Sequence, residues 1–161
     1  MPISSTGNRN RGVTLMELMV VLAIISLIVA ISFPSTIAGL ENVRLSSGAR
    51  SLAAFMSVAA NRAERREQAM ELTVFVKENV VTMHAADASF QKKLELPQGI
   101  IVQTVWPPLP EAGDAPRSFL FLPGAAPPRV GIEIVNRHGA RRIVRLNPVT
   151  GITEIERPEP E

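Results

Sequence analysis

The chain begins with a long apolar run whose length matches a lipid bilayer. Residues 18–33 carry no charged side chain. The 20 residues from Val13 to Ser32 would rise about 30 Å as an α-helix, which is the thickness of the hydrocarbon core of a bilayer. This pattern predicts one membrane-spanning helix near the N-terminus.

After Pro34 the apolar residues keep a helical period. They recur at spacings near three, four and seven, which is typical of an amphipathic helix with one face on a soluble core. We expect Pro34, which lacks an amide donor, to kink this helix, and Gly39 and Gly48 to soften it. The expected core positions are Ile37, Leu40, Leu45, Leu52, Phe55, Met56 and Ala59, and the expected outward positions are Glu41, Arg44, Arg50, Arg62 and Arg65.

Beyond residue 70 the hydrophobic period changes to two. This alternation, broken by turns rich in Gly, Pro and Asn, predicts seven short strands. They are expected at residues 71–77, 80–85, 99–106, 118–122, 130–136, 141–146 and 152–156. One long helix followed by strands predicts an α+β fold, in which an antiparallel sheet packs on the apolar face of the helix.

Composition and charge point away from enzymatic chemistry. The formal net charge is +2, and the chain has no cysteine and only two histidines, His84 and His138, far apart in sequence. No nucleotide-binding, nucleophile or metalloprotease motif is present, and oxygen-bearing side chains do not cluster as a calcium loop requires. We therefore expect no catalytic residues, no cofactor and no metal site, and no enzymatic activity.

One acid, Glu17, interrupts the start of the apolar run. In one interpretation its carboxylate reaches the membrane interface at little cost. In the other it needs a cationic partner, because a charge at the centre of a membrane helix costs on the order of 2.5 to 3.5 kcal/mol. A cut after Gly12, between the basic head and the apolar run, would create such a cation at the amino group of Val13 in a neighbouring copy.

The segment from Gly12 to Pro34 resembles the N-terminal region of type IV pilins and type II secretion pseudopilins, which carry a class III prepilin leader. The shared features are Gly12 before the cut, Val13 after it, the Thr14–Leu15 pair, Glu17 as fifth mature residue and Pro34 as the twenty-second. Members usually have Phe where this chain has Val13. The resemblance implies cleavage between Gly12 and Val13, N-methylation of Val13 and filament assembly through Glu17.

The second half resembles the domain of GspH/FimT-type pseudopilins. The matching pieces are Phe121, Pro123 and Gly124, the hairpin at residues 131–147, and the turn made by Asn147, Pro148, Thr150 and Gly151. A proline-rich stretch after Gly124 departs from that pattern in a loop. This resemblance implies a type IV pilin-like fold.

The two resemblances divide the chain into five parts. These are a cleaved leader (1–12), a transmembrane and filament-core helix (13–34), an amphipathic continuation (35–70), an antiparallel β domain (71–156) and a flexible tail (157–161). They imply a single-pass protein of the bacterial inner membrane with its C-terminal domain in the periplasm. The implied partners are other pseudopilins or pilins in a hetero-oligomeric filament, the prepilin peptidase, the inner-membrane assembly platform, membrane lipid and secreted cargo.

Two functions follow from this reading. The leading hypothesis is a minor pseudopilin at or near the tip of the pseudopilus of a type II secretion system. The alternative is a FimT-like minor type IV pilin that binds DNA for uptake or primes pilus assembly. In that case Arg141, Arg142 and Arg145 are the candidate DNA contacts, although Arg141 and Arg145 are expected on one strand face and Arg142 on the other.

Overall fold

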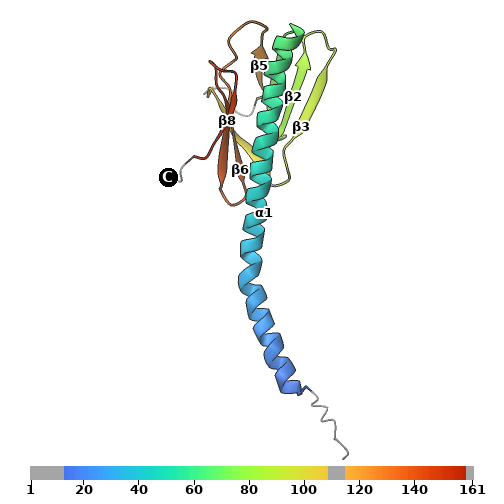
Figure 1. Ribbon diagram of the computed structural model, residues 1–161, viewed down its shortest axis with the longest axis vertical. Helices are drawn as coiled ribbons and strands as arrows, with labels where there is room; N and C mark the ends of the chain where they lie inside the picture. The colour runs from blue at the N-terminus through green and yellow to red at the C-terminus, as the bar shows by residue number, and fades with distance from the viewer. Residues whose placement is uncertain (1–12, 109–114, 159–161) are drawn as a thin grey trace, which may run out of the picture. The chain divides into compact units, whose positions relative to one another are not determined.

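The structure is a computed structural model that describes residues 13–108 and 115–158, with the backbone but not the side chains of residues 33–38. It divides into a unit that ends at Ile37 and a unit that begins at Ala38. One helix, α1 (Leu15–Arg66), continues from the first unit into the second (Figure 1). The leader, and with it Gly12, lies outside the described residues. The backbone is helical at Pro34. The kink expected there stays a prediction.

The first unit contains the apolar part of α1. From Leu15 to Ser32 the mean hydropathy is 2.7, and none of this stretch is buried by the rest of the chain. Ser26 lies within this stretch, and its hydroxyl donates to the carbonyl oxygen of Leu22 at 2.7 Å. Because that hydrogen bond stays inside the helix, the segment can enter lipid without an unpaired hydroxyl group. By length and composition the segment could span a bilayer, as the sequence predicted.

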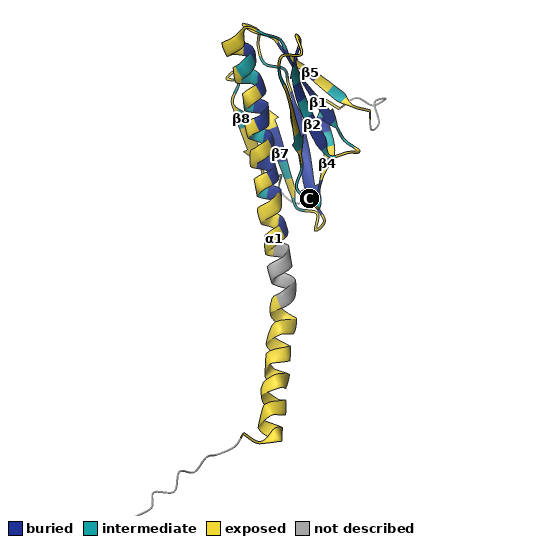
Figure 2. Cartoon of the chain, turned by 90° about the vertical axis from the view of Figure 1, so that its right-hand side faces the viewer, coloured by how far each residue is buried: buried dark blue, intermediate teal, exposed yellow. Residues whose placement is uncertain are grey.

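In the second unit one face of α1 is buried (Figure 2). Five of the predicted core positions are buried, namely Leu45, Leu52, Phe55, Met56 and Ala59, and Ala49 joins them. The prediction was wrong at two neighbouring positions, because Leu40 is half exposed and Glu41 is buried. The register of the buried face therefore brings Glu41 toward the domain. The side chain of Ile37 lies outside the description.

The helix ends at Arg66, before the predicted limit of residue 70. Glu67 takes the left-handed conformation with φ of 51°, and the amide of Gln68 donates to the carbonyl of Ala63 at 3.3 Å. This is the hydrogen-bonding pattern that closes a helix and reverses the chain. Residue 70 instead begins the first strand, so the predicted boundary was too late.

The described residues after the helix form eight strands, all paired antiparallel in two sheets. The first sheet has the order β3-β2-β1-β5 and the second has the order β4-β6-β7-β8. The prediction of seven strands in one sheet was therefore one strand and one sheet short. The strands are β1 (Met70–Phe75), β2 (Val80–Ala85), β3 (Gln91–Glu95), β4 (Ile100–Trp106), β5 (Arg117–Phe121), β6 (Gly131–Asn136), β7 (Arg141–Leu146) and β8 (Thr153–Glu156).

The missed strand, β3, has almost no hydrophobic signal. Its sequence is QKKLE, and only Leu94 is partly buried. The strand forms because it pairs with the hydrophobic β2 along the register Val81↔Leu94. Lysines on an edge strand also discourage pairing with other chains. A polar edge strand of this kind gives no period-two pattern to read.

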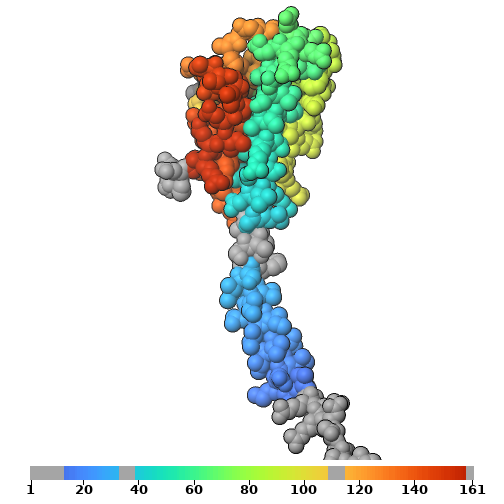
Figure 3. Space-filling model, in the orientation of Figure 1, coloured from blue at the N-terminus to red at the C-terminus, as the bar shows by residue number. Residues whose placement is uncertain are grey.

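The hydrophobic core of the second unit lies between the helix and the two sheets. In both ribbon views α1 runs along one side of the sheets (Figures 1 and 2), and the space-filling view shows the last strands directly beside it (Figure 3). The hydroxyls of Ser57 on α1 and Thr153 on β8 lie 2.8 Å apart. At Gly48 an added Cβ would lie 3.2 Å from Cδ of Pro97. Gly48, expected to soften the helix, thus also permits a close approach between α1 and the turn before β4.

Candidate assembly site on the N-terminal helix

The first turn of α1 is organised by Thr14. Its hydroxyl oxygen accepts the amide hydrogen of Glu17 at 3.2 Å, and its carbonyl accepts the amide of Leu18 at 3.1 Å. Thr14 is therefore the N-cap, and Glu17 occupies the third helical position of a T-x-x-E capping sequence. The sequence analysis used Thr14 only as part of a resemblance. The spacing T-x-x-E before an apolar run is the signal that would have revealed its structural role.

Glu17 lies inside the segment that is long and apolar enough to cross a membrane, within the first turn of its helix. Its side chain is exposed, as are those of Val13, Leu15 and Met16 around it. Near a helix N-terminus a carboxylate is favoured by the helix dipole, which removes part of the cost of the charge. The rest of that cost can be offset either by water at the membrane interface or by a cation outside this helix.

Val13 directly precedes the capping residue and is 72% exposed. A chain that began at Val13 would carry its amino group one residue before the N-cap, at the same end of the helix as Glu17. An ammonium group there is accessible to a neighbouring subunit. After such a cut, one cationic and one anionic group would stand at the start of the apolar part of α1.

The three candidate DNA-binding arginines lie on β7 but do not share a face. Register and burial place Arg141 and Arg145 on one face and Arg142 on the other. Arg142 is partly buried, which lowers the pKa of its guanidinium, with Arg157 as a second cause, and its Nη1 donates to the carbonyl of Arg141 at 2.7 Å. The set does not form one continuous surface.

The arginines on the outer face of the second sheet have acidic partners. Nη1 of Arg141 lies 3.7 Å from Oε1 of Glu133, and Nε of Arg145 lies 3.5 Å from Oε2 of Glu156. The guanidinium of Arg145 also lies 5.5 Å from the ring centre of Trp106. Because carboxylates alternate with the arginines, the face is of mixed charge rather than a phosphate-binding strip.

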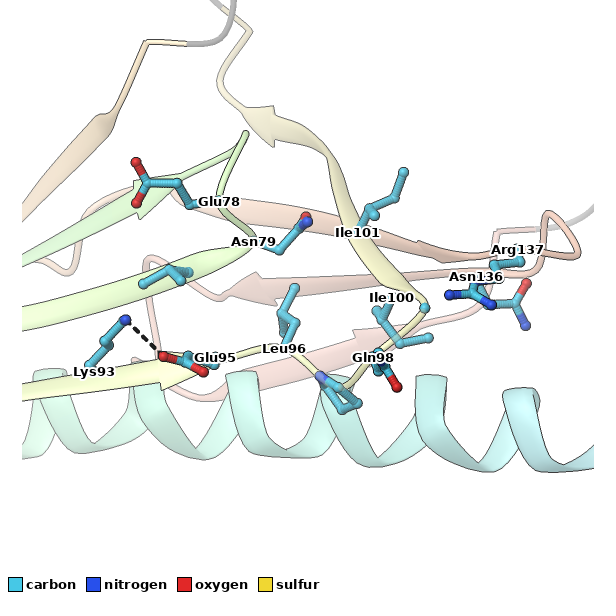
Figure 4. Close-up of a pocket in the computed structure, with 13 residues that line it drawn as sticks. Glu78, Asn79, Lys93, Glu95, Leu96, Gln98, Ile100, Ile101, Asn136 and Arg137 are labelled. Carbon is cyan, nitrogen blue, oxygen red and sulfur yellow. Dashed lines mark ion pairs between the residues drawn. The ribbon is translucent and has the colours of Figure 1, made fainter.

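A groove with a volume of about 640 Å³ lies where the ends of both sheets meet (Figure 4). Its charged lining residues balance, with Glu78 and Glu95 against Lys93 and Arg137. The ammonium of Lys93 lies 2.7 Å from the carboxylate of Glu95, and this pairing raises the pKa of Lys93 and lowers that of Glu95. The lining contains no histidine, cysteine, serine or threonine, and its one lysine is paired with Glu95.

The two histidines each contact one acid. His84 lies 3.2 Å from Glu71 across the β1–β2 pair, and His138 lies 2.8 Å from Glu41 of α1. The sequence analysis did not predict the contact between His138 and the helix. Within residues 13–108 and 115–158, no group of three or more His, Asp or Glu side chains is arranged to hold a metal ion.

Comparison with known proteins bears on both parts of the chain. Residues 7–33 match the family model of the prokaryotic N-terminal methylation motif. The structure is similar to that of the minor pseudopilin EpsH from the Type 2 Secretion System of Vibrio cholerae, with a TM-score of 0.55 and 13% sequence identity. The similarity covers 73% of this chain and 99% of EpsH. No curated protein sequence gives a significant match.

The chain has a pseudopilin fold. At 13% identity the likeness to EpsH establishes the arrangement of helix and sheets, and it confirms the predicted α+β, pilin-like class. The residues that match the methylation motif include Gly12, Val13, Thr14 and Glu17. The residues at the start of α1 that the sequence analysis named are thus part of a known N-terminal motif.

Proposed function

We propose that this protein is a minor pseudopilin, a structural subunit at or near the tip of the pseudopilus of a type II secretion system. The observation that carries the proposal is the presence of a prokaryotic methylation motif and a pseudopilin fold in one chain. The relative with the similar structure, EpsH, is itself a minor pseudopilin of a type 2 secretion system. The proposed role is structural rather than enzymatic.

The proposed life cycle begins in the bacterial inner membrane. The leader lies in the cytoplasm, the apolar part of α1 crosses the lipid once, and the β domain lies in the periplasm. A prepilin peptidase cuts between Gly12 and Val13 and methylates the new amino group. The capped first turn, with Thr14 bonded to the amide of Glu17, supports this reading because it fixes the helix start directly after the cut.

Assembly then follows from electrostatics. A charge within lipid is costly, and a pair of opposite charges in a low-dielectric medium attracts strongly. We propose that the carboxylate of Glu17 pairs with the amino group of Val13, or its equivalent, on a neighbouring pseudopilin. The pairing would bring two apolar helices into one axial register as the assembly platform adds subunits to the filament.

DNA binding by a FimT-like minor pilin has weaker support. Arg141 and Arg145 are engaged with Glu133 and Glu156, and Arg142 lies on the opposite strand face. A DNA-binding surface would require these ion pairs to open. Secreted cargo is a partner under the leading proposal, and the groove at the sheet ends is a surface that could contact it.

Replacement of Glu17 by Ala tests the assembly role. We expect Glu17→Ala to remain in the membrane fraction, because the apolar helix is intact, but to be recovered with sheared filaments at least roughly tenfold less than the wild type, a deficit of about 1.4 kcal/mol. The matched control is Ser26→Ala, which removes another polar group from the same helix whose hydrogen bond is internal. Equal recovery of both variants in the filament fraction would refute the proposal.

A further inference from the structure

The β6–β7 turn is held rigid by its own hydrogen bonds. The side-chain oxygen of Asn136 accepts the amides of His138 and Ala140 at 3.0 and 2.9 Å, and the amide of Asn136 donates to the carbonyl of Ala140 at 3.0 Å. Gly139 completes the turn with a φ of +79°, which glycine adopts without strain. The turn is therefore organised before it contacts the helix.

Two side chains of this turn reach across to α1. Nδ1 of His138 lies 2.8 Å from Oε2 of Glu41, within hydrogen-bond distance. Nδ2 of Asn136 donates to Oδ1 of Asn42 at 3.3 Å. The close-up in Figure 4 shows Asn136 at the end of β6, close to the ribbon of α1. Two consecutive helix residues are thus fastened by a single turn.

These contacts lie at the N-terminal end of the buried face of α1. Gly39 and Leu40 are exposed, Glu41 is the first buried residue of the described part of the second unit, and the apolar contacts begin only at Leu45. From Leu45 toward the C-terminus of α1, fully buried side chains hold the helix against the sheets, including Leu52 and Met56. The first attachment point of the domain on α1 is therefore polar and stands apart from the hydrophobic core.

We propose that Glu41, Asn42, Asn136 and His138 form a polar latch that opens without unfolding the domain. His138 is about half exposed, so water can replace its contact with Glu41 when the turn moves away. The buried apolar face above has no such substitute, because water does not solvate it favourably. Opening the latch would free helix residues 41–44 while Leu45 and the residues beyond it remain docked.

Under the proposed function the latch would control how much of α1 lies free of the domain. Four residues correspond to roughly 6 Å of helix, a little more than one turn. Because Leu45 and the residues beyond it stay docked, the domain would keep its position on the helix, and a subunit in a filament would gain that length of undocked helix next to the domain. This consequence rests on the proposed function, whereas the latch itself is a property of the isolated subunit.

Hydrogen exchange on the full-length protein in detergent micelles tests the latch. We expect His138→Ala and Asn42→Ala each to speed amide exchange in residues 40–44 at least about tenfold, and amides of residues 49–59 to exchange as in the wild type. Glu41→Gln keeps the size of the side chain and should have an intermediate effect. Arg44→Ala is the matched control, since Arg44 is exposed on the same helical turn.

Either of two results would overturn the proposal. Unchanged exchange in residues 40–44 of His138→Ala would mean that the turn does not hold the helix. A uniform increase from residue 40 to residue 59 would mean that the contacts support the whole fold and are not a separable latch. Because the measurement requires no filament, its outcome is independent of whether the protein assembles as proposed.

Discussion

At the scale of single residues, Asn79 shows how one side chain can close the edge of a sheet. It lies in the β1–β2 turn with φ of 54°, and its Oδ1 accepts the amide of Val102 on β4 at 2.8 Å. Its carbonyl accepts the amide of Leu96 at 3.1 Å. A turn of the first sheet thereby satisfies a donor at the edge of the second. The sequence indicates only a turn at Asn79, because its partner Val102 lies 23 residues away.

Removing this acceptor should destabilise the domain. We expect Asn79→Ala to lower the free energy of unfolding by about 1–3 kcal/mol, since it leaves a partly buried amide without its partner. Alanine at this position would also strain the left-handed backbone. Asn79→Gly separates this strain from the loss of the hydrogen bond, because glycine adopts the left-handed backbone freely but also lacks the acceptor. Urea denaturation of the full chain in micelles measures both variants. Wild-type stability in Asn79→Gly would show that the side-chain hydrogen bond contributes nothing.

At the scale of elements, the buried face of α1 was predictable in its period but not in its lower limit. The spacing of Leu45, Leu52 and Met56 fixes one helical stripe, and the domain covers it. Glu41 lies four residues before Leu45 on the same stripe and is buried against a turn almost a hundred residues later, whereas Leu40 lies off that stripe and is half exposed. Where the domain stops covering a helix depends on such long-range contacts, which a local period does not contain.

Two leucines of α1 test this limit. Leu52→Ala should cost about 2–5 kcal/mol of folding free energy, because the side chain is fully buried and its removal leaves a cavity. Leu40→Ala should change stability by no more than about 0.5 kcal/mol, because that side chain is half exposed. The same urea measurement compares them. Similar losses at both positions would show that the domain covers more of the helix than described above.

At the scale of the whole molecule, the membrane-spanning segment was the part most easily predicted from the sequence. A bilayer demands about 20 apolar residues and excludes charge, so the span and the anomaly of Glu17 appear in the sequence itself. The central strands could be read from alternation, but β3 could not, because its residues face water and its pairing with β2 is set by a distant hydrophobic strand. The division into two sheets depends on strand order, which alternation leaves open.

The most direct test of the account is chemical coupling of Glu17 in assembled filaments. A carbodiimide joins carboxylates to adjacent amines, and mass spectrometry of isotope-labelled copies mixed with unlabelled pseudopilins identifies which chains are joined. The account predicts a bond from the carboxylate of Glu17 to the N-terminal amino group of another subunit, and its loss in Glu17→Gln. Coupling of Glu17 only to its own chain, or a mature protein that does not begin at Val13, would contradict it.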